Sequence, residues 1–394
     1  MSSQGQYIRL ETTGRKTGRP HHVLLRFVTI EGRIVVFPEN KSAQDWVLNL
    51  KSDPKVRVHN EGRVIQGTAS LRHVKGLGDP LLSVLSRKYG DEVVRTTYWG
   101  QQSYVEIRRV GEASTEDYCE LVYADLEAAF DGVAEDYDRH IFGNPMNVWL
   151  RDMSLKVMND VFHSGEIVLE VGCGTGAETL SLAKRGVNVV ACDISSKMLG
   201  VLRSKSKKLG LADRITLLHC RPYELKEKVN ELGIESVDGA YSTYGAINTD
   251  PRLDDFLSNL HALLKSNAHL LLGVWNKYCL YEILGYAFRG KFSMSVARLT
   301  NPVPLGKSRF CVTTTSYSVG SLNKAVARYF RLKRVHGVCV LLPPSNLTKY
   351  LPGEPGLGWL KKVDMAFGGA FPLNRLGDHF LAVYSKIDGH DGRQ

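Results

Sequence analysis

Three glycines at alternate positions, Gly172, Gly174 and Gly176, follow a strand-like run and precede a helix-like pattern. Glycine has no Cβ, so such a loop turns tightly and lets a ligand lie against its backbone. Glu170 stands just before the loop, and Asp193 ends the next apolar run, where a carboxylate can bind both hydroxyls of a ribose. These residues predict a nucleoside-binding loop.

The spacing and the acidic residues indicate which nucleoside this loop binds. Gly-x-Gly-x-Gly differs from the Gly-x-Gly-x-x-Gly of dinucleotide binders, and the Glu170 carboxylate would repel a pyrophosphate. S-adenosylmethionine carries an ammonium group and a sulfonium but no phosphate. Glu170 at its aminoacyl end and Asp193 at its ribose therefore form a consistent set. The alternative is a Rossmann-like loop for another nucleotide, or a binding loop that has lost its chemistry.

Alternating patterns place this loop in an α/β fold. From residue 165 onward, apolar runs of strand length alternate with helix-like stretches, which implies βαβ units and a mostly parallel sheet with helices on both faces. The expected strands are 167–169, 189–191, 215–219, 237–241 and 269–275, and the expected helices are 179–185, 196–209 and 253–265.

The first part of the chain has a different pattern. Short strand-like runs dominate residues 7–109, with β-hairpins expected at 23–37 and 56–68. We expect about six strands and two short helices, near 44–50 and 79–89, because closing such a sheet into a small barrel removes exposed edges.

Length and charge also indicate more than one domain. A chain of 394 residues exceeds the usual size of a single domain. Its net charge of +10 divides into +8 for residues 1–110, −9 for 111–140 and +11 for 141–394. A basic balance by itself does not choose between nucleic acid, a membrane surface and small anionic ligands.

We place the domain boundaries around this acidic stretch. The expected order is a split β-barrel at 1–112, a linker at 113–122 and an α/β domain at 123–390. Within the last, we expect a helical segment at 123–163, a nucleotide-binding core at 164–275, an acceptor-site insertion at 276–335 and terminal strands at 336–387.

Cysteines and hydropathy exclude several classes of protein. The seven cysteines are scattered without a Cys-x-x-Cys pair, which argues against a disulfide framework or a zinc ribbon, and we predict no metal site. No apolar run has the length of a membrane helix, and the polar N-terminus does not resemble a signal peptide. We expect a cytoplasmic protein without membrane insertion.

Residues 123–387 resemble class I S-adenosylmethionine-dependent methyltransferases of the type 11 kind. The segments that carry the resemblance are Phe130–Asp138, Val168–Gly176, Cys192–Ser195, Val237–Asn248 and Gly377–Tyr384. The resemblance implies a Rossmann-like, seven-stranded methyltransferase fold whose last strand is antiparallel, and S-adenosylmethionine as cofactor.

Carried over by position, the resemblance implies a cofactor site with several parts. The residues it assigns to cofactor binding are Glu170, Gly172, Gly174, Gly176, Asp193, Ile194, Ser242, Thr243 and Gly245, with Ser242 to Gly245 beside the sulfonium. Tyr137 would close the pocket. At the adenine end many relatives have an acidic residue where this chain has the segment 220–223, so main-chain carbonyls or Glu224 would meet the amine.

Methyl transfer needs no fixed catalytic triad, because the methyl carbon is already activated. A general base is needed only for a poorly ionised hydroxyl or a protonated amine, and Tyr137 and His140 are the predicted candidates. For His140 the alternative is an ordinary surface histidine near a helix end.

The expected acceptor site includes the insertion 276–335, which is rich in aromatic residues. They either line an apolar pocket for a small hydrophobic or planar acceptor or belong to an ordinary core. The residues in question are Tyr278, Tyr281, Tyr286, Phe288, Phe292 and Phe310.

A basic turn lies before the first long strand of the barrel. Arg15, Lys16 and Thr17 stand between two glycines and are followed by Arg19, so glycine N–H groups, a hydroxyl and cations could meet a phosphate. The alternative is a solvated basic turn. With the segment around Trp46, this turn resembles the deazaflavin-dependent nitroreductase family over residues 7–110. The resemblance implies a deazaflavin coenzyme or FMN, although the loop 38–45 lacks the family's glycine.

The sequence therefore predicts a methyltransferase for a small-molecule acceptor, fused to a flavin- or deazaflavin-binding barrel through which the chain forms a homodimer. One alternative is a nucleic-acid methyltransferase, although the basic run Arg203–Lys208 lacks interleaved aromatics. The other is a flavin- or deazaflavin-dependent nitro- or quinone reductase whose second domain senses the methyl donor.

Overall fold

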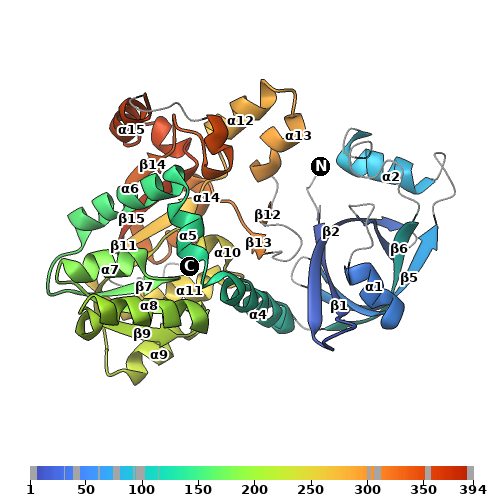
Figure 1. Cartoon of the computed structure of the whole chain (residues 1–394), viewed down its shortest axis with the longest axis horizontal. Helices are drawn as coiled ribbons and strands as arrows, with labels where there is room; N and C mark the ends of the chain where they lie inside the picture. The colour runs from blue at the N-terminus through green and yellow to red at the C-terminus, as the bar shows by residue number, and fades with distance from the viewer. Residues whose placement is uncertain are drawn as a thin grey trace. The chain divides into compact units, whose positions relative to one another are not determined.

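The computed structural model divides the chain into two compact units (Figure 1). The first comprises Met1–Asp125 with Pro304–Thr313, and the second comprises Leu126–Val303 with Thr314–Gln394. Each unit has its own hydrophobic core. The structure describes all residues except 1–6, 31, 39–44, 61–62, 74–79, 92–93, 95–102, 114, 300–302, 306–311, 351–355 and 388–394.

The first unit is a closed antiparallel barrel with the strand order β1-β2-β3-β6-β5-β4. Alternate side chains of the strands, such as Ile8 and Leu10, fill its interior. Trp46 of helix α1 joins this core, and Leu85 of helix α2 belongs to a second cluster. The elements are β1 (Tyr7–Thr13), β2 (Pro20–Ile30), β3 (Arg33–Val36), α1 (Asp45–Ser52), β4 (Lys55–Asn60), β5 (Arg63–His73), α2 (Pro80–Tyr89) and β6 (Ser103–Ala113).

Both predicted hairpins are present in the barrel. Gly32, with φ of 74°, lies in the turn that joins β2 to β3, and Asn60 pairs with Arg63 where β4 meets β5. The predicted small barrel is therefore confirmed.

The second unit is built on a seven-stranded sheet with the order β14-β15-β11-β10-β7-β8-β9. The strands are β7 (Ile167–Val171), β8 (Asn188–Asp193), β9 (Ile215–His219), β10 (Val237–Ser242), β11 (Leu264–Trp275), β14 (Phe330–Val338) and β15 (His379–Lys386). Strand β15 runs antiparallel to both of its neighbours, and the other pairs are parallel. The predicted Rossmann-like sheet with an antiparallel last strand is confirmed.

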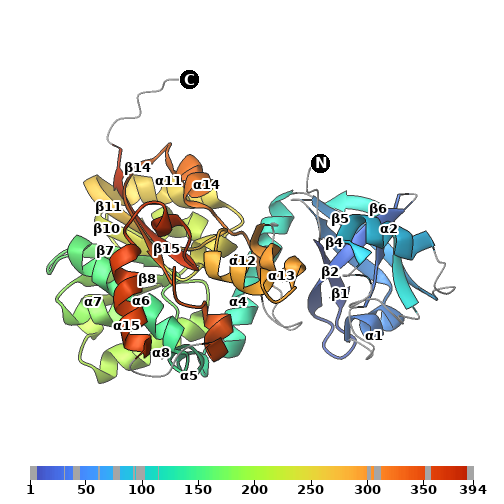
Figure 2. The same cartoon turned by 90° about the horizontal axis from the view of Figure 1, so that it is seen from above.

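Helices pack on both faces of this sheet (Figure 2). One face is covered by α6 (Pro145–Val161), α7 (Ala177–Lys184), α8 (Ser196–Lys208) and α15 (Gly356–Phe367), and the other by α9 (Leu225–Glu231), α11 (Leu253–Leu263) and α14 (Val319–Val326). Leu150 and Leu202 pack on the first face, and Phe256 and Leu322 pack on the second. The carboxyl ends of the parallel strands are left open to loops, which is where α/β folds place ligands.

The remaining elements connect and extend these layers. They are α4 (Thr115–Val133), α5 (Tyr137–Phe142), η2 (Ala212–Arg214), η3 (Pro222–Glu224), α10 (Ala246–Thr249), α12 (Leu280–Ala287), α13 (Phe292–Ser295), η4 (Ala297–Leu299), β12 (Val303–Leu305), β13 (Val312–Thr314), η5 (Ser345–Tyr350) and η6 (Leu373–Arg375). The segment 113–122, which we expected as a linker, contains the end of β6 and the first turns of α4. Within the described ranges, no helix has the length and apolar character of a membrane span.

Candidate functional site

Gly172, Gly174 and Gly176 form the loop between β7 and α7, with φ angles of 79°, 53° and 81°. A Cβ on Gly172 would lie 2.5 Å from the Cβ of Ala246, and a Cβ on Gly176 would lie 2.1 Å from Cδ1 of Leu202. The loop therefore needs glycine both for its conformation and for its close packing against α8 and α10.

The N–H groups of this loop are directed into the protein. Those of Gly172, Cys173, Gly174 and Gly176 donate to main-chain carbonyls or to the carboxylate of Asp193, over donor–acceptor distances of 2.7 to 3.0 Å. A pyrophosphate-binding loop presents such groups to phosphate oxygens. This loop therefore does not form a phosphate cradle.

Glu170 lies buried in β7, one residue before the end of the strand. The hydroxyl of Thr179 donates a hydrogen bond to its carboxylate. Burial, together with the nearby Glu178 carboxylate, raises the pKa of Glu170 to about 8. The side chain therefore carries a proton near neutral pH, and a bound cation would favour its release.

Asp193 ends β8, and its two carboxylate oxygens accept hydrogen bonds from the N–H groups of Gly174 and Ser195 at 2.7 and 2.8 Å. Burial raises the pKa of Asp193, and these two bonds oppose that rise. Each oxygen keeps a further lone pair that can accept from a ribose hydroxyl. The carbonyl of the next residue, Ile194, accepts from Nε2 of His219 at 2.9 Å.

The end of α4 and the short helix α5 are tied to this edge of the sheet. Asp131 accepts a hydrogen bond from the hydroxyl of Ser195 at 2.6 Å. Asp138 accepts one from the hydroxyl of Thr175 in the glycine loop at 2.5 Å and pairs with Lys205. These contacts hold α5 against the loop.

The two predicted catalytic residues lie on α5 in different surroundings. The ring of Tyr137 lies beside Gly174, with Cε1 3.8 Å from the position that a Cβ would take. Burial raises the pKa of Tyr137, so its hydroxyl is better suited to donate a hydrogen bond than to accept a proton. His140 is exposed to solvent. The structure thus places Tyr137, but not His140, against the glycine loop.

The loop after β10 forms the next part of the edge. Ser242 and Thr243 are buried, and the backbone then takes positive φ at Tyr244 (56°) and Gly245 (91°). The guanidinium carbon of Arg151 lies 4.6 Å from the centre of the Tyr244 ring. A left-handed conformation at a bulky tyrosine is strained, and here it goes with a ring that lies against Arg151.

Arg151 links this loop to α7. Its Nη1 lies 2.6 and 2.5 Å from the two carboxylate oxygens of Glu178, and the hydroxyl of Tyr244 donates to Ser154 at 2.7 Å. Asn248 links the same loop to β11, because its side chain bonds both backbone groups of Trp275. Asn248 ends the segment Val237–Asn248 that carries the methyltransferase resemblance, but sequence reasoning missed its contact with Trp275.

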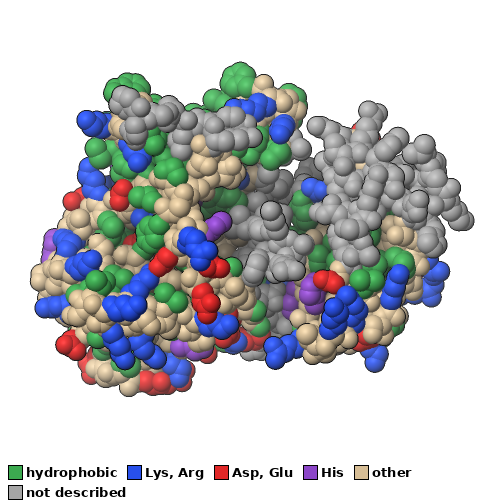
Figure 3. Space-filling model, viewed as in Figure 1, with side chains coloured by type: hydrophobic (Ala, Val, Ile, Leu, Met, Phe, Trp, Pro, Cys, Tyr) green, Lys and Arg blue, Asp and Glu red, His purple; other side chains and the backbone are tan. Residues whose placement is uncertain are grey.

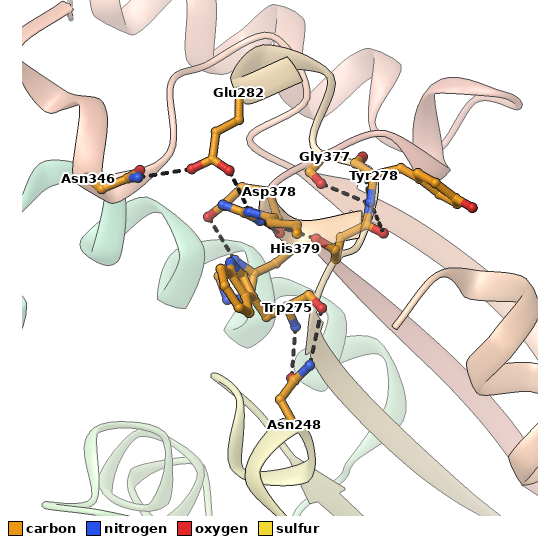
Figure 4. Close-up of polar contacts among 10 residues, drawn as sticks. Asn248, Trp275, Tyr278, Glu282, Asn346, Gly377, Asp378 and His379 are labelled. Atoms are coloured by element: carbon orange, nitrogen blue, oxygen red, sulfur yellow. Dashed lines mark hydrogen bonds and ion pairs between the residues drawn. The ribbon is translucent and has the colours of Figure 1, made fainter. Parts of the chain in front are cut away.

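A second buried cluster, which sequence reasoning also missed, lies at the start of β15 (Figure 4). Arg298 lies between two carboxylates, with Nε 2.6 Å from Glu282 and Nη2 2.5 Å from Asp378. Its guanidinium carbon is 4.4 Å from the centre of the Trp275 ring. The other oxygen of Asp378 lies 2.9 Å from Nδ1 of His379.

The residues expected at the adenine end have local partners. Glu224 accepts a hydrogen bond from the N–H of Arg221 at 2.8 Å, within its own turn. The side chain of Arg221 donates to the hydroxyl of Tyr223 at 3.2 Å. Glu224 therefore caps this turn with one oxygen of its carboxylate.

The aromatic residues of the insertion differ in burial. Tyr278, Phe288 and Phe292 are exposed, by 43, 87 and 61%. Tyr281 and Tyr286 are half-buried, and Phe310 lies outside the described residues. Burial in an ordinary core therefore does not account for the three exposed rings.

The basic turn of the barrel closes on itself. The N–H groups of Gly14, Thr17 and Gly18 donate to carbonyls of the turn, and that of Arg15 donates to the side chain of Asn49 at 3.1 Å. The expectation that the glycines present free N–H groups to a phosphate is therefore wrong, because acceptors inside the protein already engage them.

What the turn offers to an anion is side-chain charge. Arg15 is partly engaged, with Nη1 3.0 Å from Asp45, whereas Lys16, Thr17 and Arg19 are exposed. The predicted loop before Trp46 falls largely at 39–44, outside the described residues.

The barrel also groups three possible metal ligands that sequence reasoning missed. Ligand atoms of Glu11, His22 and His59 all lie within 4.8 Å of one another. Arg57 lies 3.7 Å from the same Glu11 carboxylate. Burial raises the pKa of Glu11, but hydrogen bonds and charges from the two histidines lower it well below its usual range, which is typical of a carboxylate paired with cations.

Two family models match the chain, one on each side of α4. Residues 168–267 match the methyltransferase domain family, and residues 2–83 match the F420H2-dependent quinone reductase family. The first match contains the glycine loop and Asp193, and the second contains the basic turn.

Three similar curated proteins are named as methyltransferases of different acceptors. A ubiquinone/menaquinone biosynthesis C-methyltransferase of Allorhizobium ampelinum is 29% identical over 151 residues, which are 36% of this chain and 55% of that protein. The demethylmenaquinone methyltransferase of Thermobifida fusca is 33% identical over 92 residues, 23% of this chain and 37% of its own. The tRNA 5-carboxymethoxyuridine methyltransferase of Escherichia coli is 28% identical over 97 residues, which are 23% of this chain and 36% of that protein.

The chain thus spans about half or a third of the length of these relatives. Among solved structures, a SAM-dependent methyltransferase from Aquifex aeolicus aligns with 65% of this chain and 98% of its own, at 17% identity and a TM-score of 0.40.

Proposed function

We propose that this chain, which joins a methyltransferase domain to an F420H2-dependent quinone reductase-like barrel, transfers a methyl group from S-adenosylmethionine to a small-molecule acceptor. The observation that carries the proposal is the glycine loop after β7. Its N–H groups are directed into the protein, and the buried carboxyl groups of Glu170 and Asp193 flank it.

Charge favours a cationic nucleoside in this loop. A phosphate would find few free N–H donors there and two acidic groups close by, so its desolvation would not be compensated. An ammonium group beside Glu170 would instead bind the carboxylate form of a group whose pKa is raised to about 8. Asp193 has acceptor capacity left for two ribose hydroxyls.

Bound S-adenosylmethionine supplies an activated methyl carbon for an in-line displacement. The residues of this chain then contribute position and exclusion of water. Asp193 and the glycine loop fix the nucleoside, Tyr137 lies over the loop from α5, and buried Ser242 and Thr243 form a dry edge after β10.

The acceptor class is inferred from relatives of both domains. The barrel matches a family of quinone reductases, and two relatives of the chain are named for methylation in quinone biosynthesis. A planar aromatic acceptor of quinone or hydroquinone type is therefore the proposed substrate class.

A nucleic-acid acceptor, as in the tRNA-modifying relative, has less support. In the basic run on α8, Lys205 pairs with Asp138 and donates to the carbonyl of Thr175. On the face seen in Figure 3, basic side chains of the second unit are interspersed with acidic ones. Nucleic-acid binding would be steeply salt-dependent, which distinguishes this function.

Calorimetric titration of the full chain with S-adenosylmethionine tests the proposal. We expect a dissociation constant in the micromolar range, which corresponds to a binding free energy of about −8 kcal/mol. The affinity should fall at least roughly tenfold in Asp193→Ala. Asp213→Ala, at an exposed carboxylate of η2, is the matched control and should bind as the wild type does. Absence of binding to the wild type would contradict the proposal.

The barrel supports a second function, the binding of a deazaflavin or flavin. Its match to the F420H2-dependent family over residues 2–83 and its closed six-stranded architecture favour this function. A fluorescence titration with coenzyme F420 or FMN tests it directly.

A further inference from the structure

We propose that His379 is the general base of the methyl transfer, that Asp378 positions it, and that the acceptor atom is a weakly acidic aromatic hydroxyl. This inference rests on the proposed function, since it assigns a proton acceptor to that reaction. It begins from the cluster at the start of β15 (Figure 4).

His379 lies at the edge of the sheet where the cofactor residues are. It is the first residue of β15 and pairs with Trp275, the last residue of the parallel strand β11. Because β15 runs antiparallel, its first residue lies at the carboxyl ends of the parallel strands, as do the loops after β7 and β10. The fold thus brings His379 to the ligand-binding edge.

A direct contact joins His379 to the loop after β10. The centres of the His379 and Tyr244 rings are 6.5 Å apart. Leu381, two residues after His379 in β15, and Thr243 of the loop after β10 both lie against Gly273. His379 therefore borders the residues that are expected beside the sulfonium.

The hydrogen bond to Asp378 determines which ring nitrogen can accept a proton. Burial raises the pKa of Asp378, but the charge of Arg298 and the contact with His379 lower it well below its usual range. An ionised carboxylate can only accept, so Nδ1 of His379 must donate across the 2.9 Å contact. In a neutral imidazole, Nε2 then holds the free lone pair.

Nε2 of His379 is placed differently from Nε2 of two other histidines, His261 and His59. Among the described residues, Nε2 of His379 has no protein partner, whereas Nε2 of His261 meets a main-chain carbonyl and Nε2 of His59 meets Glu11. The side chain of His379 is 16% exposed, while that of Asp378 is 2% exposed. The ring is therefore fixed at one end and accessible at the other.

The groups packed around Asp378 hold it in place. Arg298 lies between the carboxylates of Glu282 and Asp378. Burial raises the pKa of the Cys279 thiol to about 12, so this thiol stays neutral. Nδ1 of His379 therefore meets a carboxylate that Arg298 fixes from the other side.

The proposed step is a single displacement coupled to a proton transfer. A lone pair of the acceptor oxygen forms the new O–C bond, the C–S bond breaks, and its electron pair stays on sulfur as S-adenosylhomocysteine. The hydroxyl proton moves to Nε2 of His379 and leaves to solvent after product release. Carboxylate and thiolate acceptors need no such base, whereas a poorly ionised hydroxyl does. In the proposed substrate class that hydroxyl belongs to a phenol or hydroquinone.

Several titratable groups face His379 and bear on the pH dependence of the transfer. Arg298 and Asp378 are charged and paired, and Glu282 is paired with Arg298. Burial raises the pKa of Tyr244 and of Cys339, which follows the end of β14, well above their usual values, as it does for Cys279. Glu170 acts on cofactor binding, so rates are compared at saturating S-adenosylmethionine.

The test measures methyl transfer from labelled S-adenosylmethionine to 1,4-naphthohydroquinone by the full chain. His379→Asn keeps a donor to Asp378 but removes Nε2. This substitution should lower kcat about 100-fold or more and abolish the acid limb of the pH–rate profile. Added imidazole should restore activity, and the affinity for the cofactor should not change. His261→Gln, on α11, is the matched control and should behave as the wild type does.

Each outcome is decisive. Unchanged kcat and pH profile in His379→Asn, or loss without imidazole rescue, would overturn the base assignment. Cofactor binding by the wild type without transfer to the hydroquinone would overturn the acceptor class and leave the methyltransferase proposal standing. Absence of cofactor binding would instead defeat the proposed function itself.

Discussion

Two glycine-containing turns of this chain look alike in sequence but differ in their surroundings. The loop 172–176 and the turn 14–19 both direct most of their N–H groups into the protein. Buried carboxyl groups of Glu170 and Asp193 flank the first, whereas exposed Lys16 belongs to the second. The glycines allow close packing against α8 and α10 in one case and a tight turn in the other.

Neighbouring side chains, more than the glycines, therefore decide the charge of the ligand. Buried acidic groups act in a low dielectric and favour a cation strongly. Exposed cations act through water and are screened by salt. Substitutions at the first site should therefore have larger effects than those at the second.

The largest effect is expected for Gly176→Ala. A Cβ there would lie 2.1 Å from Cδ1 of Leu202, at a φ of 81°, so overpacking adds to left-handed strain. We expect a loss of about 3 kcal/mol in the free energy of unfolding of the second unit, measured by denaturant titration.

Gly18→Ala is the matched control, because its φ is also positive (65°) but no atom lies within 4 Å of the added Cβ. We expect a loss of only about 1 kcal/mol in the barrel. Equal losses for the two variants would contradict the distinction between the turns.

The next effect concerns Glu170 and pH. A cation bound beside it favours the carboxylate, and its pKa is about 8 in the free protein. The affinity for S-adenosylmethionine should rise between pH 6 and 7.5, by up to about tenfold per pH unit. This window lies below the range near pH 7.7–8.0, in which an α-amino group itself loses its proton. Calorimetry in buffers of different ionisation heat should detect proton release on binding.

Glu170→Gln should weaken binding and remove most of this slope. The stability of the folded protein depends on pH in the opposite direction from the affinity. Because the pKa of Glu170 is raised in the folded state, this group contributes to the free energy of unfolding below the usual carboxyl pKa of 4.5. That contribution is lost as the pH rises through about 8. A wild-type affinity that does not change with pH would show that Glu170 does not meet the cation.

The smallest effect is expected in the barrel. Lys16→Ala, at an exposed cation, should weaken binding of coenzyme F420 or FMN by only a few-fold at low salt, with the difference vanishing at high salt. Lys51→Ala, on α1, is a comparable exposed cation outside the turn. A salt-independent loss of affinity in Lys16→Ala would indicate direct, desolvated contact instead.

Periodicity and glycine spacing predicted the architecture well, because both depend on local sequence. Strand and helix patterns gave both hairpins of the barrel and the five parallel strands from β7 to β11. The boundary before β11 was less accurate: the helix expected to end at residue 265 ends at Leu263, and the strand begins at Leu264 rather than at 269. Strand pairing, which local patterns do not encode, decides that boundary.

The polar partners could not be predicted in the same way. Arg298 and Asp378 are 80 residues apart, and Asn248 meets Trp275 across 27 residues, so no sequence spacing announces either contact. The exposure of Phe288 has the same cause, because burial depends on which elements pack together. His379 was part of a recognised motif, but its role depends on these long-range partners.

A paired titration of the wild-type chain shows whether the loop after β7 binds a phosphate-free, cationic nucleoside. Calorimetry with S-adenosylmethionine and, separately, with NAD should give micromolar binding of the first and no measurable binding of the second. NAD binding as tight as that of S-adenosylmethionine, or no heat from S-adenosylmethionine, would contradict the account.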